Sequence, residues 1–217
     1  MPHDIHEIVR HLRTAYSDWR QPVVTEMAER GRDPFRVLIS TLLSLRTKDE
    51  VTRDASERLF ALADTPDRIL KLDTATIEKA IYPVGFYHNK ARNVLDICRT
   101  LVEKYDGEVP RDIDELLALK GVGRKTANLV LTKGFGLQGI CVDTHVHRIM
   151  NRFGYVLTKS PDETEFRLRE ILPPEYWIDI NDLLVAFGQN LCRPISPICS
   201  QCPVHVQCNR VGVTVHR

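Results

Sequence analysis

The 217-residue sequence has no uninterrupted apolar run long enough to cross a membrane. Such a span needs roughly 18 or more consecutive apolar residues. The first residues, MPHDIHEIVRHLR, carry charges and histidines where a secretory signal would be apolar. These two absences predict a soluble protein of the cell interior.

The sequence also lacks period-two alternation, internal repeats, low-complexity tracts and long Gly/Ser linkers. Its apolar residues fall instead at helical intervals, which predicts an all-α fold. The clearest helix covers residues 90–107, with one apolar stripe and Gly107 as its stop. Residues 35–45 are apolar around most of the helix circumference, which predicts a helix in the centre of a domain.

Two helix starts carry recognisable caps. Thr47 and Glu50 have the spacing of a capping box and predict that a helix over residues 49–62 opens there. Thr65 followed by Pro66 predicts another start.

The net charge is only +1, but the charges are unevenly distributed. Residues 116–152 contain six Lys and Arg residues against Asp143 alone, which gives +5, and residues 161–190 reverse this with −5. The basic block could face a polyanion such as nucleic acid. The alternative is an ordinary solvated run of charges.

Six cysteines divide into two kinds by context. Cys98 and Cys141 lie among apolar residues and are expected to be small core side chains. The others form a C-x6-C-x2-C-x5-C array, which in an intracellular chain favours a metal centre over disulfides: Cys192, Cys199, Cys202 and Cys208. Zinc and an iron–sulfur cluster both accept four thiolates. The single tight C-x2-C pair favours a [4Fe–4S] cluster, and zinc stays open at this point.

The stretch KGVGRKTANL joins two expected helices through two glycines. Gly121 and Gly123 permit positive φ and let backbone N–H groups approach a ligand at the start of the second helix. Such a hairpin could bind a DNA phosphate without reading a base. A plain helix–helix turn is the alternative. A dinucleotide fold is not expected, because no strand precedes the motif and no third glycine follows at the required spacing.

Two residues near this hairpin could carry chemistry. Lys125 falls in the first helical turn, where the helix dipole and Arg124 disfavour a charged ammonium, and a neutral lysine is a nucleophile. An ordinary phosphate-binding lysine is the alternative. Asp143 directly precedes another helix, so its expected structural role is an N-cap, which is compatible with a catalytic role.

The motifs LKGVGRKTANLVL, VDTHVHRIMNR, LISTLLSLRTKD and VGFYHNKARNV, followed by the cysteine array, resemble the endonuclease III family. These are helix-hairpin-helix DNA glycosylases and lyases of base-excision repair, and the resemblance runs from about residue 30 to 208. It implies an all-α, two-domain protein. A six-helix domain would cover residues 27–137, and residues 1–26 with 138–217 would form a domain with a [4Fe–4S] cluster. Double-stranded DNA would lie across the cleft between them.

The resemblance also implies roles for individual residues. Lys125 and Asp143 match the catalytic positions, and the four clustered cysteines match the cluster ligands. The expected DNA contacts are Arg46, Phe86, Lys120, Gly121, Gly123, Arg124, Thr144 and Arg193. The implied activity is removal of oxidised pyrimidines followed by strand cleavage at the abasic site. A cytoplasmic monomer, on the nucleoid when bound to DNA, is expected.

The sequence departs from the usual family pattern at several DNA-facing positions. Arg46 stands where glutamine is usual, Phe86 where leucine is common, and Lys120 where proline is common. Leu117 replaces a pocket glutamate of some members. These departures leave the chemistry intact and leave the preferred base and its opposite base open.

Two other functions compete with this interpretation. A mismatch glycosylase that removes thymine or adenine without cutting would share the fold, but such relatives usually lack the lysine at position 125. A non-enzymatic DNA-binding module with a redox-sensing cluster would explain the hairpin and the cysteines. It would leave Lys125 and Asp143 unexplained.

Overall fold

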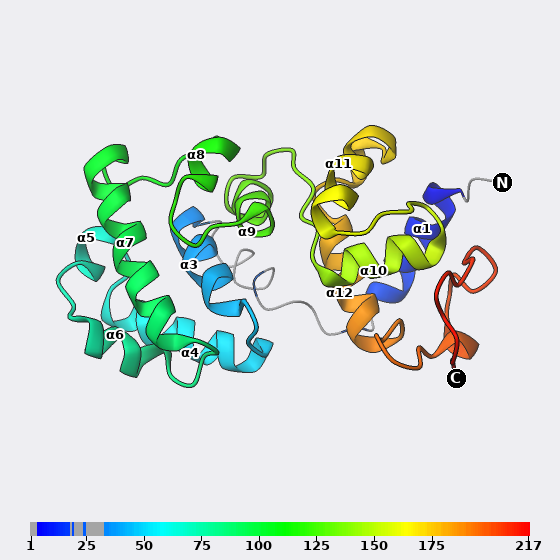
Figure 1. The fold of residues 1–217 in the computed structure, drawn as a ribbon, viewed down its shortest axis with the longest axis horizontal. Coiled ribbons are helices and arrows are strands. Elements are labelled where there is room, and N and C mark those ends of the chain that lie inside the picture. The colour runs from blue at the N-terminus through cyan, green and yellow to red at the C-terminus, as the bar shows by residue number, and fades with distance from the viewer. Residues whose placement is uncertain (1–3, 18, 20–23, 25–32) are drawn as a thin grey trace. The chain divides into compact units, whose positions relative to one another are not determined.

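The computed structural model describes residues 4–17, 19, 24 and 33–217. Within these residues, every regular element is a helix and no strand occurs, which confirms the predicted all-α fold (Figure 1). The chain forms two compact units, Met1–Pro22 with Ile140–Arg217, and Val23–Gly139. The boundary expected at residues 26 and 27 lies outside the described residues. The second boundary between the units lies between residues 139 and 140, two residues after the position between 137 and 138 that the sequence predicts.

The unit of residues 23–139 is built around α3, a helix buried on most of its surface. Asp33 caps its first turn by accepting the N–H groups of Phe35 and Arg36 at 2.9 and 3.1 Å. The helix contacts α4, α7, α9 and a π-helical turn, as the apolar pattern predicts for a central helix. Within the described residues of this unit, the helices are α3 (Pro34–Ser44), α4 (Asp49–Leu62), α5 (Pro66–Ile69), α6 (Thr74–Ile81), α7 (Tyr87–Tyr105), α8 (Ile113–Leu117), α9 (Arg124–Leu129) and the π-helix Val130–Gly134.

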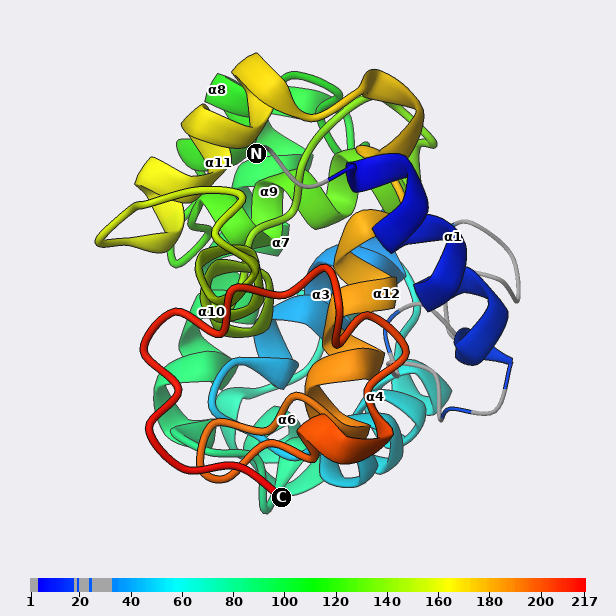
Figure 2. The ribbon, with the colours of Figure 1, turned by 90° about the vertical axis from the view of Figure 1, so that its right-hand side faces the viewer.

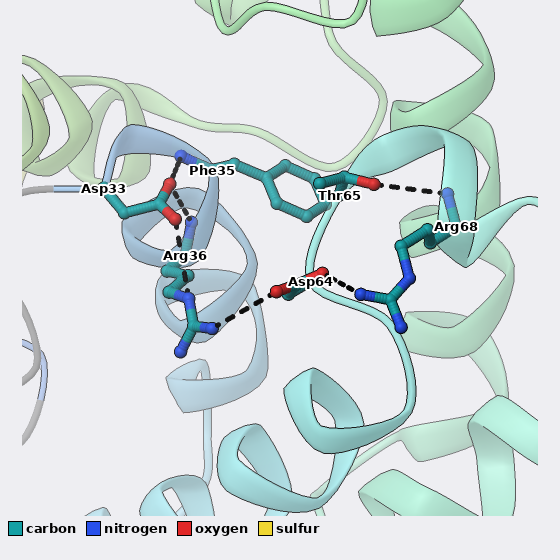
Figure 3. A network of polar contacts seen from close by, with 6 residues as sticks. All are labelled: Asp33, Phe35, Arg36, Asp64, Thr65 and Arg68. Atoms are coloured by element: carbon teal, nitrogen blue, oxygen red, sulfur yellow. Dashed lines mark hydrogen bonds and ion pairs between the residues drawn. The ribbon is translucent and has the colours of Figure 1, made fainter.

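A polar network ties the start of α3 to the start of α5 (Figure 3). Arg36 lies 3.5 Å from Asp33 and 3.8 Å from Asp64, and Asp64 also accepts from Arg68 at 2.7 Å. Thr65 accepts the backbone N–H of Arg68 at 3.4 Å, so the predicted helix start at Thr65 is confirmed. These ion pairs are partly exposed, and each stabilises the fold by at most about 1 kcal/mol.

The start of α4 differs from the sequence prediction. The helix does begin at Asp49, but its N-cap is Lys48, which makes no side-chain capping bond. The Thr47 hydroxyl donates to the carbonyl of Leu45 at 3.3 Å and accepts from the N–H of Gly85 at 3.1 Å. The predicted capping box is therefore wrong, because a partner distant in sequence occupies the threonine hydroxyl.

The longest helix, α7, matches its predicted stripe and stop. Its inward face buries Ala91, Val94, Cys98 and Leu101 among others. The helix ends at Tyr105; its C-cap, Asp106, has φ of 52°, and Gly107 follows with φ of 81°. The N–H of Gly107 donates back to Leu101 at 3.0 Å, a C-terminal closure that glycine permits.

The other unit joins the N-terminal helix to the C-terminal third of the chain. Helix α1 packs against α12, as can be followed in Figures 1 and 2. The core of this unit includes the aromatic rings of Phe153 and Phe187, stacked at 6.2 Å. In the described part of the chain, none of the helices combines the length and the apolar character that a membrane span requires. The elements described in this unit are α1 (Ile5–Tyr16), α10 (Thr144–Phe153), α11 (Pro161–Ile171), α12 (Ile180–Asn190) and the 3-10 turns Pro174–Tyr176 and Cys199–Gln201.

Candidate functional site

The glycine hairpin joins α8 to α9, as the sequence predicts. Gly121 has φ of +80°, and a Cβ there would lie 2.6 Å from Nδ2 of Asn93. Gly123 is the N-cap of α9 with φ of −101°, so the expected positive φ holds only for Gly121. Apart from its own neighbours in the chain, a Cβ added at Gly123 would meet no atom of the described residues within 4 Å. The space beside Gly123 is therefore open to a ligand.

Lys125 lies in the first turn of α9, one residue after Arg124, and both side chains are half-buried. Helix α9 continues into the π-helix, which ends where Gly134 packs on α3. A Cβ at Gly134 would lie only 2.9 Å from Cα of Pro34. The hairpin and its lysine are thus anchored directly on the central helix of their unit. Single π turns often occur at functional sites.

Lys120 precedes the hairpin and makes a contact that the sequence does not reveal. Its Nζ lies 2.5 Å from Oδ2 of Asp96 on α7. The resulting ion pair lowers the pKa of Asp96, and the hydrogen bond from Lys120 is the largest cause. Because the Lys120 side chain is exposed, this ion pair stabilises the fold only weakly.

Arg46 and Phe86 lie on one exposed surface of the same unit. Both have left-handed backbones, with φ of 54° and 60°. The guanidinium of Arg46 lies over the ring of Phe86, 5.6 Å from its centroid. The Phe86 side chain is exposed, with 60% of its surface accessible to solvent.

Asp143 caps α10 in the other unit, which confirms its expected structural role. One carboxylate oxygen accepts the N–H groups of His145 and Val146 at 2.8 and 2.9 Å. The side chain is buried, with 9% of its surface exposed. Thr144, the first residue of α10, is exposed. The structure therefore holds this carboxylate in one orientation.

The basic block is not one exposed surface, which corrects the expectation from charge alone. It spans both units, and its last two arginines point inward. Arg148 donates to the carbonyl of Cys192 at 2.9 Å, and burial lowers its pKa. Arg152 is only 8% exposed. It donates to the carbonyls of Arg193 and Pro194, both at 2.7 Å. These two side chains hold the loop that contains the first clustered cysteine.

The four clustered cysteines all line one pocket, which is partly open to solvent. Burial raises the pKa of Cys202 to about 12, with further contributions from the neighbouring thiols. The pKa values of Cys199 and Cys208 are raised for the same reasons. Arg152 lies 3.4 Å from Sγ of Cys192. Within the described ranges, no group of three or more His, Cys, Asp and Glu side chains is arranged to hold a single metal ion.

The remaining cysteines behave as the sequence predicts. Cys98 and Cys141 are fully buried core residues. Arg193, the expected DNA contact of the cysteine loop, has an exposed side chain. Its backbone carbonyl is engaged by Arg152.

Sequence reasoning missed two buried cations that organise these surfaces, Arg152 and Lys90. Lys90 donates to backbone carbonyls at the end of α3. Each lies at helical spacing from predicted core residues, Arg152 three after Ile149 and Lys90 four before Val94. That spacing was the available signal, because a charge on an apolar helix face must find polar partners.

Comparison with known proteins agrees with this geometry. Residues 39–174 match the family model of the HhH-GPD superfamily base excision DNA repair proteins. Endonuclease III of Thermotoga maritima is 49% identical over 176 residues, covering 81% of this chain and 83% of the relative.

The solved structures that resemble this fold include two endonuclease III–DNA complexes. A non-covalent endonuclease III–DNA complex has a TM-score of 0.85 and 37% identity, covering 95% of this chain and 94% of that one. A trapped endonuclease III–DNA covalent intermediate with an estranged adenine has a TM-score of 0.78 and 40% identity, covering 82% and 84%. The chain belongs to the endonuclease III family, within the HhH-GPD superfamily of base excision DNA repair proteins.

Proposed function

We propose that this chain removes oxidised pyrimidines from duplex DNA through a Schiff base on Lys125 and then cuts the strand by β-elimination. Its family makes it a DNA glycosylase and AP lyase of base-excision repair. The observation that carries the finer proposal is the position of Lys125, in the first turn of α9 directly behind the glycine hairpin.

The hairpin would hold the DNA backbone. Gly123 leaves open space beside the N-terminal N–H groups of α9, and Arg124 adds a positive charge there. Backbone N–H groups at a helix start favour a phosphate without reading a base. Solved relatives include endonuclease III bound to DNA, which supports a DNA-binding role for the same motif. Lys120, Thr144 and Arg193 would add contacts.

The glycosylase step needs the damaged nucleotide outside the stack. Nζ of Lys125, in its neutral form, would attack C1′ of the deoxyribose. The bond from C1′ to the base nitrogen breaks, and the departing base takes the electron pair and is protonated. Opening of the sugar ring then gives a Schiff base between Nζ and C1′. A relative has been solved as a trapped covalent intermediate with DNA, in keeping with such an enzyme–DNA bond.

The lyase step follows from that Schiff base. The iminium withdraws electrons and acidifies a proton on C2′. Loss of this proton forms the C1′–C2′ enamine, and expulsion of the 3′ phosphate breaks the C3′–O bond. Hydrolysis then returns Lys125 as a free amine. The strand is cut on the 3′ side of the lesion.

Asp143 would supply a fixed negative charge. A carboxylate can accept a proton from the attacking lysine and stabilise positive charge on the sugar. The two capping bonds, from the N–H groups of His145 and Val146, hold this carboxylate in one orientation.

The four cysteine thiols would hold a [4Fe–4S] cluster. All four line one pocket, and their spacing contains only one tight C-x2-C pair, whereas structural zinc sites commonly use two. Burial disfavours free thiolates here, so a cationic cofactor would compensate their charge. When bound, the cluster would supply iron–thiolate bonds that close the loop carrying Arg193. A brown protein with broad absorbance near ~400 nm is expected, whereas a colourless protein with stoichiometric zinc would contradict this assignment.

Borohydride trapping tests the chemistry. On a duplex with an abasic site or an oxidised pyrimidine, the wild type should form a covalent adduct and Lys125→Gln should not. Trapping of the variant at the wild-type level would overturn the mechanism. Arg124→Gln is the control, because it should weaken binding and still be trapped at saturating enzyme.

We also propose that the protein acts as a monomer in the cytoplasm and lies on the nucleoid when bound to DNA. Sedimentation with and without a lesion duplex tests the first point. A stable dimer in the absence of DNA would contradict it.

A further inference from the structure

We propose that Lys90 and Thr47 are positioning residues that hold Arg46 and Phe86 together as one preformed wedge for opening damaged DNA. "The wedge" here means Arg46 and Phe86. This inference rests on the proposed function, because it concerns how the chain would open a duplex around the lesion.

Arg46 and Phe86 adopt backbone conformations that arginine and phenylalanine rarely adopt. Left-handed φ values are uncommon outside glycine, asparagine and aspartate, yet Arg46 and Phe86 both adopt them. Both side chains are exposed, so burial of the side chains cannot enforce these conformations. The surrounding backbone must impose them, and such over-determined conformations gather at functional sites.

Lys90 fixes the segment on the N-terminal side of Arg46. It lies in the first turn of α7 and is only 6% exposed. Its Nζ donates to the carbonyls of Leu43 at 2.8 Å and Leu45 at 2.5 Å. These carbonyls belong to the last turn of α3 and its C-cap, where no intrahelical donor remains. The lysine therefore ends α3 and orients the peptide that leads into Arg46.

Thr47 fixes the other side and links the two halves of the wedge. Its hydroxyl lies 3.2 Å from Nζ of Lys90 and accepts the N–H of Gly85 at 3.1 Å. Gly85 immediately precedes Phe86. A Cβ at Gly85 would lie 2.6 Å from the carbonyl oxygen of Arg46, so the two backbones touch. One buried ammonium and one hydroxyl thus secure both left-handed residues.

The arrangement makes the wedge a single unit. The guanidinium of Arg46 already lies over the Phe86 ring, and a cation–π contact of this kind is geometrically restrictive. Removing the donors of Lys90 would leave buried carbonyls unpaired and free the segment to relax. The wedge would then have to be ordered at each encounter with DNA, which reduces its effectiveness.

The test uses Lys90→Met, which keeps the apolar stem and removes the donors, and Thr47→Val, which is nearly isosteric. The affinity of each variant is measured for a duplex carrying a tetrahydrofuran abasic analogue and for the undamaged duplex. A 2-aminopurine opposite the abasic analogue reports by its fluorescence whether the duplex is opened. Lys90→Met should lower the preference for the abasic duplex by about 10-fold and remove most of the fluorescence change on binding. Borohydride trapping on a single-stranded abasic oligonucleotide should stay within about 2-fold of wild type, because no duplex is opened there.

Two controls separate positioning from general destabilisation. Ile97→Ala removes a buried side chain from the same helix without touching the wedge, and it should leave the duplex preference unchanged. Lys90→Arg keeps donors at the site and should restore part of the preference. If Lys90→Met does not fold, Thr47→Val decides the question by the same criterion.

Three outcomes are distinguishable. The proposal would be overturned if a folded Lys90→Met kept the wild-type preference for the abasic duplex and the wild-type 2-aminopurine fluorescence change. If Lys90→Met does not fold, the same result in Thr47→Val would overturn it. Equal loss in Ile97→Ala would also overturn it, since the effect would then follow stability alone. Failure of the wild type to be trapped on any abasic substrate would instead refute the proposed function.

Discussion

Arg152 donates from one guanidinium nitrogen to the carbonyl oxygen of Pro194 at 2.7 Å, across a separation of 42 residues in the chain. A second nitrogen reaches the carbonyl of Arg193 at 2.7 Å and lies 3.4 Å from the thiol of Cys192. A buried arginine therefore organises the loop in which the first clustered cysteine lies.

Arg152→Met should destabilise this unit by about 2–4 kcal/mol, because it leaves several buried carbonyls without a donor. The same variant should purify with less iron and weaker absorbance near ~400 nm. Urea unfolding and iron analysis measure the two effects. Arg193→Met is the matched control in the same loop. It should keep its stability and iron, and lose only DNA affinity. Equal stability of Arg152→Met and wild type would contradict the structural role.

The two hairpin glycines should respond differently to the same substitution. Gly121→Ala should lower the free energy of unfolding by about 1–3 kcal/mol, since φ at this position is positive and a Cβ would collide with the side chain of Asn93. Gly123→Ala should cost at most about 1 kcal/mol and weaken binding to any duplex, because the methyl group would fill the space left for a phosphate. Thermal unfolding and fluorescence anisotropy measure the pair. Wild-type DNA affinity in Gly123→Ala would exclude this space as a phosphate contact.

The capping role of Asp143 and the role of its negative charge can be tested separately. Asparagine is an equally good N-cap, so Asp143→Asn should unfold within about 1 kcal/mol of wild type. It should lose about 100-fold or more in single-turnover glycosylase rate, because the fixed negative charge is gone. Asp143→Ala should lose a further ~1 kcal/mol of stability. An active Asp143→Asn would restrict this residue to its capping role.

Lys90 should make stability depend on pH in the alkaline range. Burial lowers its pKa from the ordinary 10.5 to about 8. The folded state therefore binds this proton less tightly than the unfolded chain. Between about pH 8 and 10.5 the unfolded chain holds more protons, so wild-type stability should rise relative to Lys90→Met. The full gain is about 3 kcal/mol. Urea unfolding of both proteins at pH 7 and 10 measures the difference, since other titrating groups cancel. A pH-independent difference would contradict the burial effect.

Helix positions could be predicted from the sequence because helical periodicity is a local signal. The apolar stripe of α7 and its stop at Gly107 needed only spacing and the conformational freedom of glycine. The N-cap at Asp143 was equally local, since a carboxylate reaches N–H groups two and three residues away. The capping box at Thr47 was wrong because Gly85, 38 residues away, takes the hydroxyl.

The chemical character of the candidate site was also visible in the sequence. The hairpin lysine, the aspartate before a helix and the four-cysteine spacing are short-range motifs whose residue types limit what they can bind. Charge counting was less reliable, because it assigned Arg148 and Arg152 to an exposed basic surface. Counting charges along the chain does not show which side chains are buried.

The sequence by itself thus determined the all-α class, the family and the position of each motif, because these depend on residues close together in the chain. Only the tertiary structure decided where the buried cations go. It brought Lys90 to the end of α3 and Arg152 to the cysteine loop. It also placed Arg46 and Phe86 in left-handed conformations against each other. A buried charge pairs with whichever carbonyls the packing brings within reach, and those partners are 40 to 47 residues away in the sequence.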